Sequence, residues 1–103
     1  MSLTVEHREN LSGALVNPKL SYRAKGILAF LTLLGDTDDI SIDFLLTNSS
    51  EGRTAVRSAL STLEKNGFLR VTRNRDERGA YGSANWLVDC SGELTLGISY
   101  GKN

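Results

Sequence analysis

The fold is decided by residues 51–69, which read EGRTAVRSALSTLEKNGFL. Apolar side chains recur there at helical spacing, so a helix over about residues 51–66 is expected to bury one face, formed by Val56, Ala59, Leu60 and Leu63. Ser50 precedes this helix as its expected N-cap. Gly67 follows it as a residue that readily adopts the left-handed conformation that ends a helix. The chain then resumes as a strand.

The opposite face of this helix carries cations and hydroxyl groups, with no acidic residue between Gly52 and Leu63. Its side chains are Arg53, Thr54, Arg57, Ser58 and Ser61. Guanidinium and hydroxyl groups on a helix can contact phosphates and base edges when the helix lies in the major groove of DNA. The alternative is an ordinary amphipathic helix with a solvated polar face. The neighbouring segments bear on the choice between these two interpretations.

Two further helices are expected before this one. Ser21 can cap a helix over about residues 22–34, in which a wide apolar stripe marks the core side and Gly35 ends the helix. Ser41 can cap a short, mostly apolar helix that ends at the polar residues 47–50. A short helix, a tight turn and a longer helix with a basic face form the layout of a helix-turn-helix, whose second helix enters the major groove.

Two alternating segments after the helix predict a β-hairpin. Residues 68–73 and 84–90 are rich in strand formers, and the glycine-containing stretch 74–83 predicts a reversal of about ten residues between them. A basic hairpin that follows a helix-turn-helix is a wing. Its arginines are expected to contact phosphates or a narrow minor groove, and they are Arg73, Arg75 and Arg78. The alternative for these arginines is a solvated loop. Trp86 is expected to anchor the hairpin in the core.

The two ends of the chain are less strongly patterned. Residues 3–7 alternate and predict a short strand at the edge of a sheet, whereas residues 9–16 predict no single structure. Residues 93–100 alternate as well. The C-terminal residues 91–103 are therefore expected to form either a further strand or an arm used for dimerisation, which leaves a homodimer open.

A single domain over residues 1–103 is expected, with its core over about residues 3–90, because 40% apolar side chains suit one small core. Twelve basic and twelve acidic residues give a net charge of zero, which argues against indiscriminate binding to nucleic acid. The charge is unevenly distributed. Residues 52–88 hold seven bases and three acids, a net +4, whereas residues 1–51 hold four bases and seven acids, a net −3. This asymmetry indicates that one surface faces a polyanion.

Cysteine and histidine usage narrows the chemistry. One cysteine, Cys90, excludes an internal disulfide, and one histidine, His7, excludes a metal site built from several histidines. The sequence shows neither an evident pair of nucleophile and base nor a glycine-rich phosphate loop. We therefore expect that the chain is not an enzyme, that it has no catalytic residue, and that it binds no metal or cofactor. The lack of a secretory signal and of an apolar run of about eighteen residues predicts a cytoplasmic protein with no membrane partner.

Four motifs occur in the order found in a known domain. Residues 17–29 (NPKLSYRAKGILA) resemble its NPxLSxxAKGLLA opening, and residues 51–60 resemble its recognition helix. Residues 63–69 (LEKNGFL) resemble its LExxGYL step into the wing, and residues 75–79 (RDERG) resemble its wing tip. Over about residues 3–90, the chain therefore resembles winged helix-turn-helix domains of bacterial, actinobacterial and phage origin, which occur in transcription regulators and at the N-terminus of phage-type replication proteins.

The resemblance implies an α+β fold, namely a winged helix-turn-helix with a three-helix core and a β-hairpin wing, and double-stranded DNA as the ligand. We expect a sequence-specific DNA-binding protein, a bacterial transcription regulator, with the helix over about residues 51–66 in the major groove and the wing over about residues 68–90 on the backbone. The expected contacts are Arg53, Thr54, Arg57, Ser58, Ser61, Arg73, Arg75 and Arg78. The alternative is a protein-interaction module on the same fold in a replication or regulatory complex. Its basic face would meet an acidic partner, or its C-terminal strand would pair with another chain.

Overall fold

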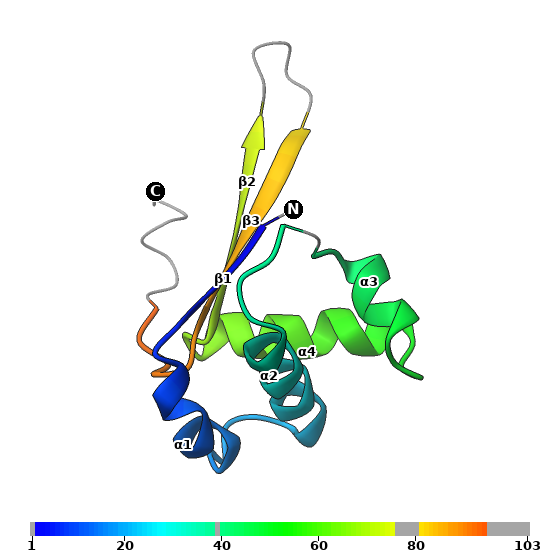
Figure 1. The fold of residues 1–103 in the computed structure, drawn as a ribbon. Helices are drawn as coiled ribbons and strands as arrows, with labels where there is room; N and C mark the ends of the chain where they lie inside the picture. Colours follow the sequence, from blue (N-terminus) through cyan, green and yellow to red (C-terminus); the bar gives the residue numbers. More distant parts are fainter. Residues whose placement is uncertain (1, 39, 76–80, 95–103) are drawn as a thin grey trace.

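A computed structural model describes the backbone of residues 2–38, 40–75 and 81–94, and side chains in the same ranges except for residues 73–84 (Figure 1). Within these residues the chain forms four α-helices, one short 3-10 helix and a three-stranded mixed sheet, which confirms the predicted α+β class. In chain order the elements are β1 (Ser2–Glu6), the 3-10 helix (Arg8–Asn10), α1 (Leu11–Leu15), α2 (Tyr22–Leu34), α3 (Ile42–Thr47), α4 (Arg53–Lys65), β2 (Leu69–Arg75) and β3 (Tyr81–Asp89).

The sheet has the strand order β1-β3-β2, with β1 parallel to β3 and β2 antiparallel to β3. Side chains alternate between the two faces of each strand, and the apolar ones gather on the face that joins the core. These core-facing residues are Leu3 and Val5 on β1, Trp86 and Val88 on β3, and Leu69 and Val71 on β2. The side chain of Trp86 is buried, which confirms its predicted role as an anchor. The far ends of β2 and β3 project away from the helices (Figure 1).

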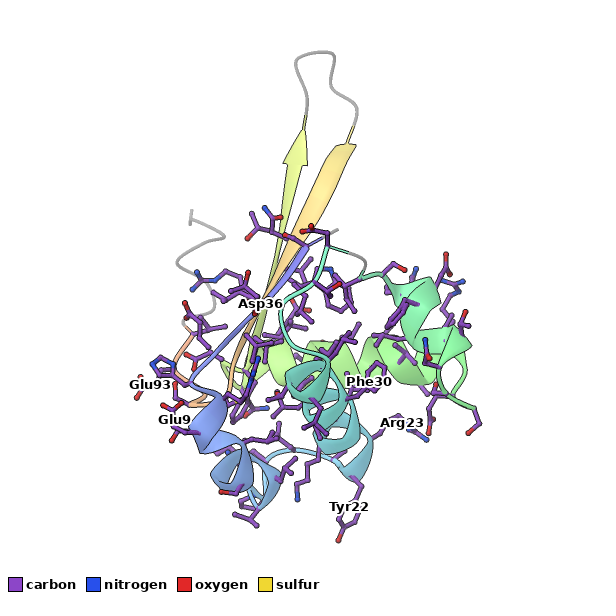
Figure 2. All side chains as sticks on the ribbon, in the orientation of Figure 1. Glu9, Tyr22, Arg23, Phe30, Asp36 and Glu93 are labelled. Carbon is purple, nitrogen blue, oxygen red and sulfur yellow. The ribbon has the colours of Figure 1, made fainter. Side chains whose placement is uncertain are left out.

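The N-terminal strand lies at the edge of the sheet, as predicted, and its outer side is covered. Leu3 exchanges two backbone hydrogen bonds with Thr37, at N···O distances of 2.7 and 3.1 Å. The Val5 N–H donates to the carboxylate of Asp36 at 2.9 Å, and Figure 2 shows Asp36 beside β1. This strand, paired parallel to β3, is not part of the expected three-helix core and hairpin wing.

The helix ends follow the local sequence signals. The Ser21 hydroxyl caps α2 by accepting a hydrogen bond from the Ala24 N–H at 3.1 Å, and the Ser41 hydroxyl caps α3 by accepting one from the Phe44 N–H at 3.0 Å. Both predicted caps are confirmed. The sequence did not predict α1, a five-residue helix in which Ala14 is the one buried residue, because so short a segment carries almost no periodic signal.

The apolar face of α4 is buried as predicted. Val56, Ala59, Leu60 and Leu63 are 1%, 3%, 6% and 0% exposed, and α4 packs against α2, α3 and β2. Because the polar residues lie on the opposite side of the helix from these four, burial of the apolar face leaves the polar side toward solvent.

The predicted start of this helix is wrong. Ser50 is not the N-cap, since the helix begins at Arg53 with Gly52 as its cap residue. The Ser49 hydroxyl accepts a hydrogen bond from the Glu51 N–H at 3.1 Å, and the Glu51 carboxylate accepts one from Arg23 of α2 at 2.7 Å. These two interactions hold the chain out of the helix before residue 52.

The predicted length of the hairpin reversal is also wrong. β2 continues to Arg75 and β3 begins at Tyr81, with Arg75 opposite Tyr81 and a register shift after Arg73. Backbone pairing extends the hairpin beyond the apolar alternation that marked the strands, because ladder hydrogen bonds do not require apolar side chains. The predicted contact Arg78 lies outside the described residues, as do residues 95–103 of the predicted strand or arm over residues 91–103.

The longest helices in the described part of the chain have 13 residues, and none of its helices is long and apolar enough to cross a membrane.

Gly67 ends α4 in a left-handed conformation, with a φ of 83°, as predicted. A Cβ at this position would lie 2.5 Å from the carbonyl oxygen of Gly92. We expect Gly67→Ala to lower the free energy of unfolding by about 2 kcal/mol or more, measured by urea denaturation, because it adds a steric clash to an unfavourable backbone conformation.

Gly26→Ala is the matched control for this substitution. Gly26 is exposed within α2, and a Cβ there would meet nothing within 4 Å. This change is expected to raise the free energy of unfolding by about 0.5–1 kcal/mol. Equal effects of the two substitutions would contradict the packing described around Gly67.

Candidate nucleic-acid interface

The candidate interface is the polar side of α4. Arg53, Thr54, Arg57 and Ser58 are exposed there, and Ser61 is half-buried. The structure therefore brings five of the eight predicted contact residues onto one helix, on the side opposite its core face. A rigid helix with hydroxyl and guanidinium groups along one side presents hydrogen-bond donors at spacings suited to a groove of duplex DNA.

Arg53 stands at the first turn of α4 and is tied to the preceding helix. Its guanidinium donates to the carboxylate of Asp43 at 2.9 Å, and the two side chains are 53% and 80% exposed. An ion pair this open to water contributes only about 0–1 kcal/mol to stability. Arg53 can therefore exchange Asp43 for a phosphate at little cost. Sequence reasoning missed this partner, although both residues occupy first turns of adjacent helices.

Arg57 lies one turn further along α4 and differs from Arg53 in its surroundings. Among the residues that the structure describes, it is exposed and has no hydrogen-bond or ion-pair partner. Its guanidinium is always charged and offers donors in a fixed planar arrangement. Arg57 is thus the side chain on this face with most freedom to accept a new anionic or base-edge partner.

A second ion pair fixes the approach to α4. Arg23, near the start of α2, donates to Glu51 at 2.7 Å, and Figure 2 shows Arg23 and Tyr22 at that end of the helix. The pair lies beside a small groove between α2 and the α3–α4 turn, lined in part by the apolar Ile27 and Phe30. The two charges of this pair offset each other locally.

The hairpin arginines are only partly placed. The backbone of Arg73 and Arg75 belongs to β2, but their side chains and all of Arg78 lie outside the described residues. Their predicted contacts with DNA therefore stay predictions.

A separate group of polar side chains joins β1 to the end of β3. The buried Asp89 carboxylate accepts hydrogen bonds from His7 Nδ1 at 2.9 Å, from the Ser91 N–H at 2.9 Å and from the Ser91 hydroxyl at 2.6 Å. Burial alone would raise the pKa of Asp89, but the hydrogen bonds from Ser91 and His7 outweigh it and hold this pKa below its ordinary value. The same hydrogen bond and the negative charge of Asp89 raise the pKa of His7.

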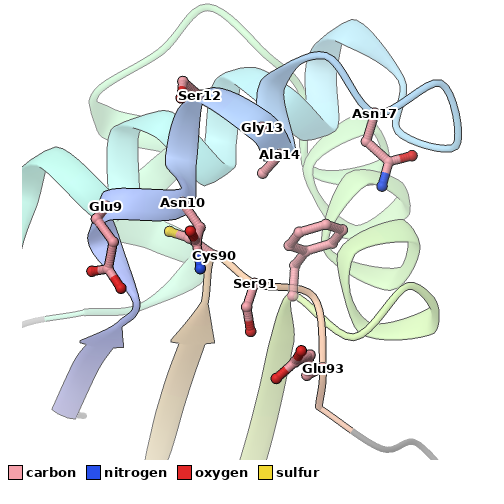
Figure 3. Close-up of a pocket in the computed structure, with 10 residues that line it drawn as sticks. Glu9, Asn10, Ser12, Gly13, Ala14, Asn17, Cys90, Ser91 and Glu93 are labelled. Atoms are coloured by element: carbon pink, nitrogen blue, oxygen red, sulfur yellow. The ribbon is translucent and has the colours of Figure 1, made fainter.

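The remaining titratable group of note is Cys90, beside an open groove (Figure 3). Glu9 and Glu93 reach this groove from the 3-10 helix and from the segment after β3. The Cys90 thiol is buried, lies 3.3 Å from the hydroxyl of Thr32, and has its pKa raised by burial. A buried, protonated thiol is a weak nucleophile, so its surroundings suit a core position.

The His7–Asp89 pair predicts a pH-dependent stability. Because the pKa of His7 is raised on folding, its contribution to the free energy of unfolding is fully present below about pH 6.5 and is lost as the pH rises through the folded pKa. Because the pKa of Asp89 is lowered, its contribution is lost as the pH falls through that folded pKa, below about 3.9. The charged pair therefore stabilises the fold most between these limits.

We expect the melting temperature of the wild type to exceed that of His7→Asn most at about pH 5–6, and the difference to shrink above the raised pKa of His7. Asparagine suits this site because His7 has a left-handed φ of 55°, which asparagine tolerates better than most residues. A difference in melting temperature between the two proteins that stays constant from about pH 5 to pH 9, the range in which histidine titrates, would contradict the pairing.

Comparisons with known proteins add no relative. No family model, no curated protein and no solved structure matches the chain. The candidate interface is therefore defined by the geometry of its own residues.

Proposed function

We propose that the chain is a winged helix-turn-helix domain that binds double-stranded DNA in a sequence-specific manner and acts as a bacterial transcription regulator. In this proposal α3 and α4 are the helix-turn-helix and the β2–β3 hairpin is the wing. The observation that carries it is the two-sided character of α4. One side is anchored in the core through Val56 and Leu63, and the other exposes Arg53 and Arg57.

The geometry of α4 supports a role in the major groove. The helix extends for 13 residues and is held by α2, α3 and β2, so its exposed side chains share one rigid frame. Arg57 is free to form a bidentate contact with a guanine, which is the commonest specific contact of arginine with DNA. Thr54 and Ser58 lie beside it as hydrogen-bonding groups, and Arg53 can move from Asp43 to a phosphate.

The hairpin supplies the second part of the proposal. β2 and β3 leave the helical layer as a two-stranded ribbon (Figure 1). The ribbon and its connection carry Arg73, Arg75 and Arg78, which are proposed to contact the DNA backbone next to α4. Phosphate contacts fix the position of a protein on the duplex, while the base contacts of the helix supply the sequence preference.

A protein-interaction module on the same fold is the second candidate function. The observation that favours it is the outward side of α2, where Tyr22 and Leu33 are 90% and 80% exposed (Tyr22 is labelled in Figure 2). Large apolar side chains on a helix surface can form the centre of a protein interface. If a partner docks on this side of α2, Leu33→Ser would weaken its capture and Arg57→Gln would have no effect on it.

We expect Arg57→Gln to weaken binding by about 1–3 kcal/mol, measured by fluorescence anisotropy on a duplex selected from a random library, because it removes a base-edge contact. Lys19→Gln removes the same charge from an exposed position before α2 and is expected to leave affinity nearly unchanged. If the wild type shows no salt-sensitive binding to any selected duplex, the proposed function is wrong.

Arg75→Gln is expected to act differently from Arg57→Gln. A phosphate contact carries no sequence information, so affinity should fall by a similar factor for selected and random duplexes. The slope of log K against log salt concentration should become shallower by about one unit. An unchanged slope, measured over several salt concentrations, would remove Arg75 from the interface and leave the role of α4 to be judged separately.

A further inference from the structure

The two edges of the sheet differ in what covers them. On the outer side of β1, the backbone N–H and C=O of Leu3 are both hydrogen-bonded to Thr37, and the N–H of Val5 donates to the Asp36 carboxylate. Such cover is a common way to stop an edge strand from pairing with another chain. In the described part of the chain no strand or side chain covers β2 in this way, although β2 is the other edge of the sheet.

The register fixes which backbone groups β2 presents at its open edge. The Asp89 N–H donates to the Phe68 carbonyl at 2.9 Å, so this residue pair lies at a hydrogen-bonded position of the β2–β3 ladder, although the Phe68 N–H donates to the Leu63 carbonyl instead. Such pairs alternate along an antiparallel ladder, so the next ones toward the hairpin are Arg70 with Leu87 and Thr72 with Asn85. The N–H and C=O groups that point away from β3 therefore belong to Leu69, Val71 and Arg73.

A hydrogen bond just before β2 shows where the segment after β3 passes. The carbonyl of Gly67, which ends α4 and precedes β2, accepts a hydrogen bond from the Leu94 N–H at 3.0 Å. Within β2, the outward backbone groups of Leu69, Val71 and Arg73 have no hydrogen bond to another described residue.

The charge of this edge selects the kind of strand that fits. Residues 69–75 contain three arginines and no acidic residue, and Arg70 and Thr72 share the sheet face opposite the core. A second copy of β2 would place like charges across the new strand pair, which is unfavourable. A strand with acidic side chains would place opposite charges there and gain from the pairing.

We propose that the open edge of β2 binds an extended, acidic segment of a partner protein, which adds to the sheet as a fourth strand. Backbone hydrogen bonds to Leu69, Val71 and Arg73 hold the segment, and Arg70, on the sheet face opposite the core, selects its charge. This interaction does not depend on DNA binding by α4. It uses the strand edge, which the proposed groove contact of the helix leaves unoccupied.

Amide hydrogen exchange of the full-length protein, followed by NMR, tests the proposal. In the free protein, the amides of Leu69, Val71 and Arg73 should exchange faster than those of Arg70 and Thr72, which donate to β3. A short acetylated peptide of alternating glutamate and valine, added at about ten times its Kd, should slow the three outward amides about tenfold. A peptide of the same design with lysine in place of glutamate should have no such effect.

Two variants separate backbone pairing from charge. Val71→Pro removes one outward N–H and leaves the β3 ladder intact, so it should abolish binding of the acidic peptide while the NMR spectrum of the helices stays unchanged. Arg70→Glu keeps the backbone and should shift the preference from the glutamate peptide toward the lysine peptide. This second variant remains informative if Val71→Pro does not fold.

Three results would overturn the proposal. The first is slow exchange of the outward amides in the free protein, which would show that the edge is occupied by this chain itself or by a second copy. The second is the lack of any protection by the glutamate peptide, and the third is equal protection by both peptides. None of these results bears on binding of DNA by α4, so failure here is distinguishable from failure of the proposed function.

Discussion

Burial of the apolar face of α4 is the constraint on which the rest of the structure depends. Val56 and Leu63 are essentially inaccessible, and each buried aliphatic side chain of this size contributes about 1.5–3 kcal/mol. The exposed pair between Arg53 and Asp43 contributes at most about 1 kcal/mol. The core therefore decides how α4 is oriented, and the charged groups on its other side remain available for a ligand. In this way the packing of the helix determines which of its residues can act in recognition.

The sheet likewise has one edge that is covered by other residues and one that, in the described part of the chain, is not. β1 runs parallel to β3 and is sealed on its outer side by Thr37 and Asp36. The His7–Asp89 hydrogen bond fastens the end of β1 to the end of β3. The β2 side has no comparable cover in the described residues, and its strand continues into a basic ribbon. The acidic N-terminal half of the chain thus closes one edge of the fold, and the basic half carries both proposed interaction surfaces.

The sequence predicted features that depend on residues within a turn of one another, and it did not predict features that depend on residues far apart in the chain. Ser21, Ser41 and Gly67 were recognisable because caps depend on residues within one turn of the helix. Ser50 failed as a cap because an ion pair between Arg23 and Glu51, which are 28 residues apart, helps to hold the chain extended at that point. The exposed face of α4 was predictable from its periodicity, which is also a local property.

Tertiary pairings account for what the sequence could not predict. His7 and Asp89 are 82 residues apart, and the parallel pairing of β1 with β3 leaves no pattern in either strand that identifies the other. Asp43 was missed as the partner of Arg53 because the turn between α3 and α4 sets their distance. The strands of the hairpin were predicted, but its length was not, since backbone pairing continues beyond the apolar residues.

The central claim is that the polar face of α4 contacts duplex DNA. Chemical-shift mapping of the isotopically labelled protein during titration with a selected duplex tests it most directly. The account predicts that the largest amide shifts fall on α4 at Arg53, Thr54, Arg57 and Ser58, with smaller shifts along the hairpin. Shifts confined to the outward side of α2, or no shifts at low salt, would contradict it.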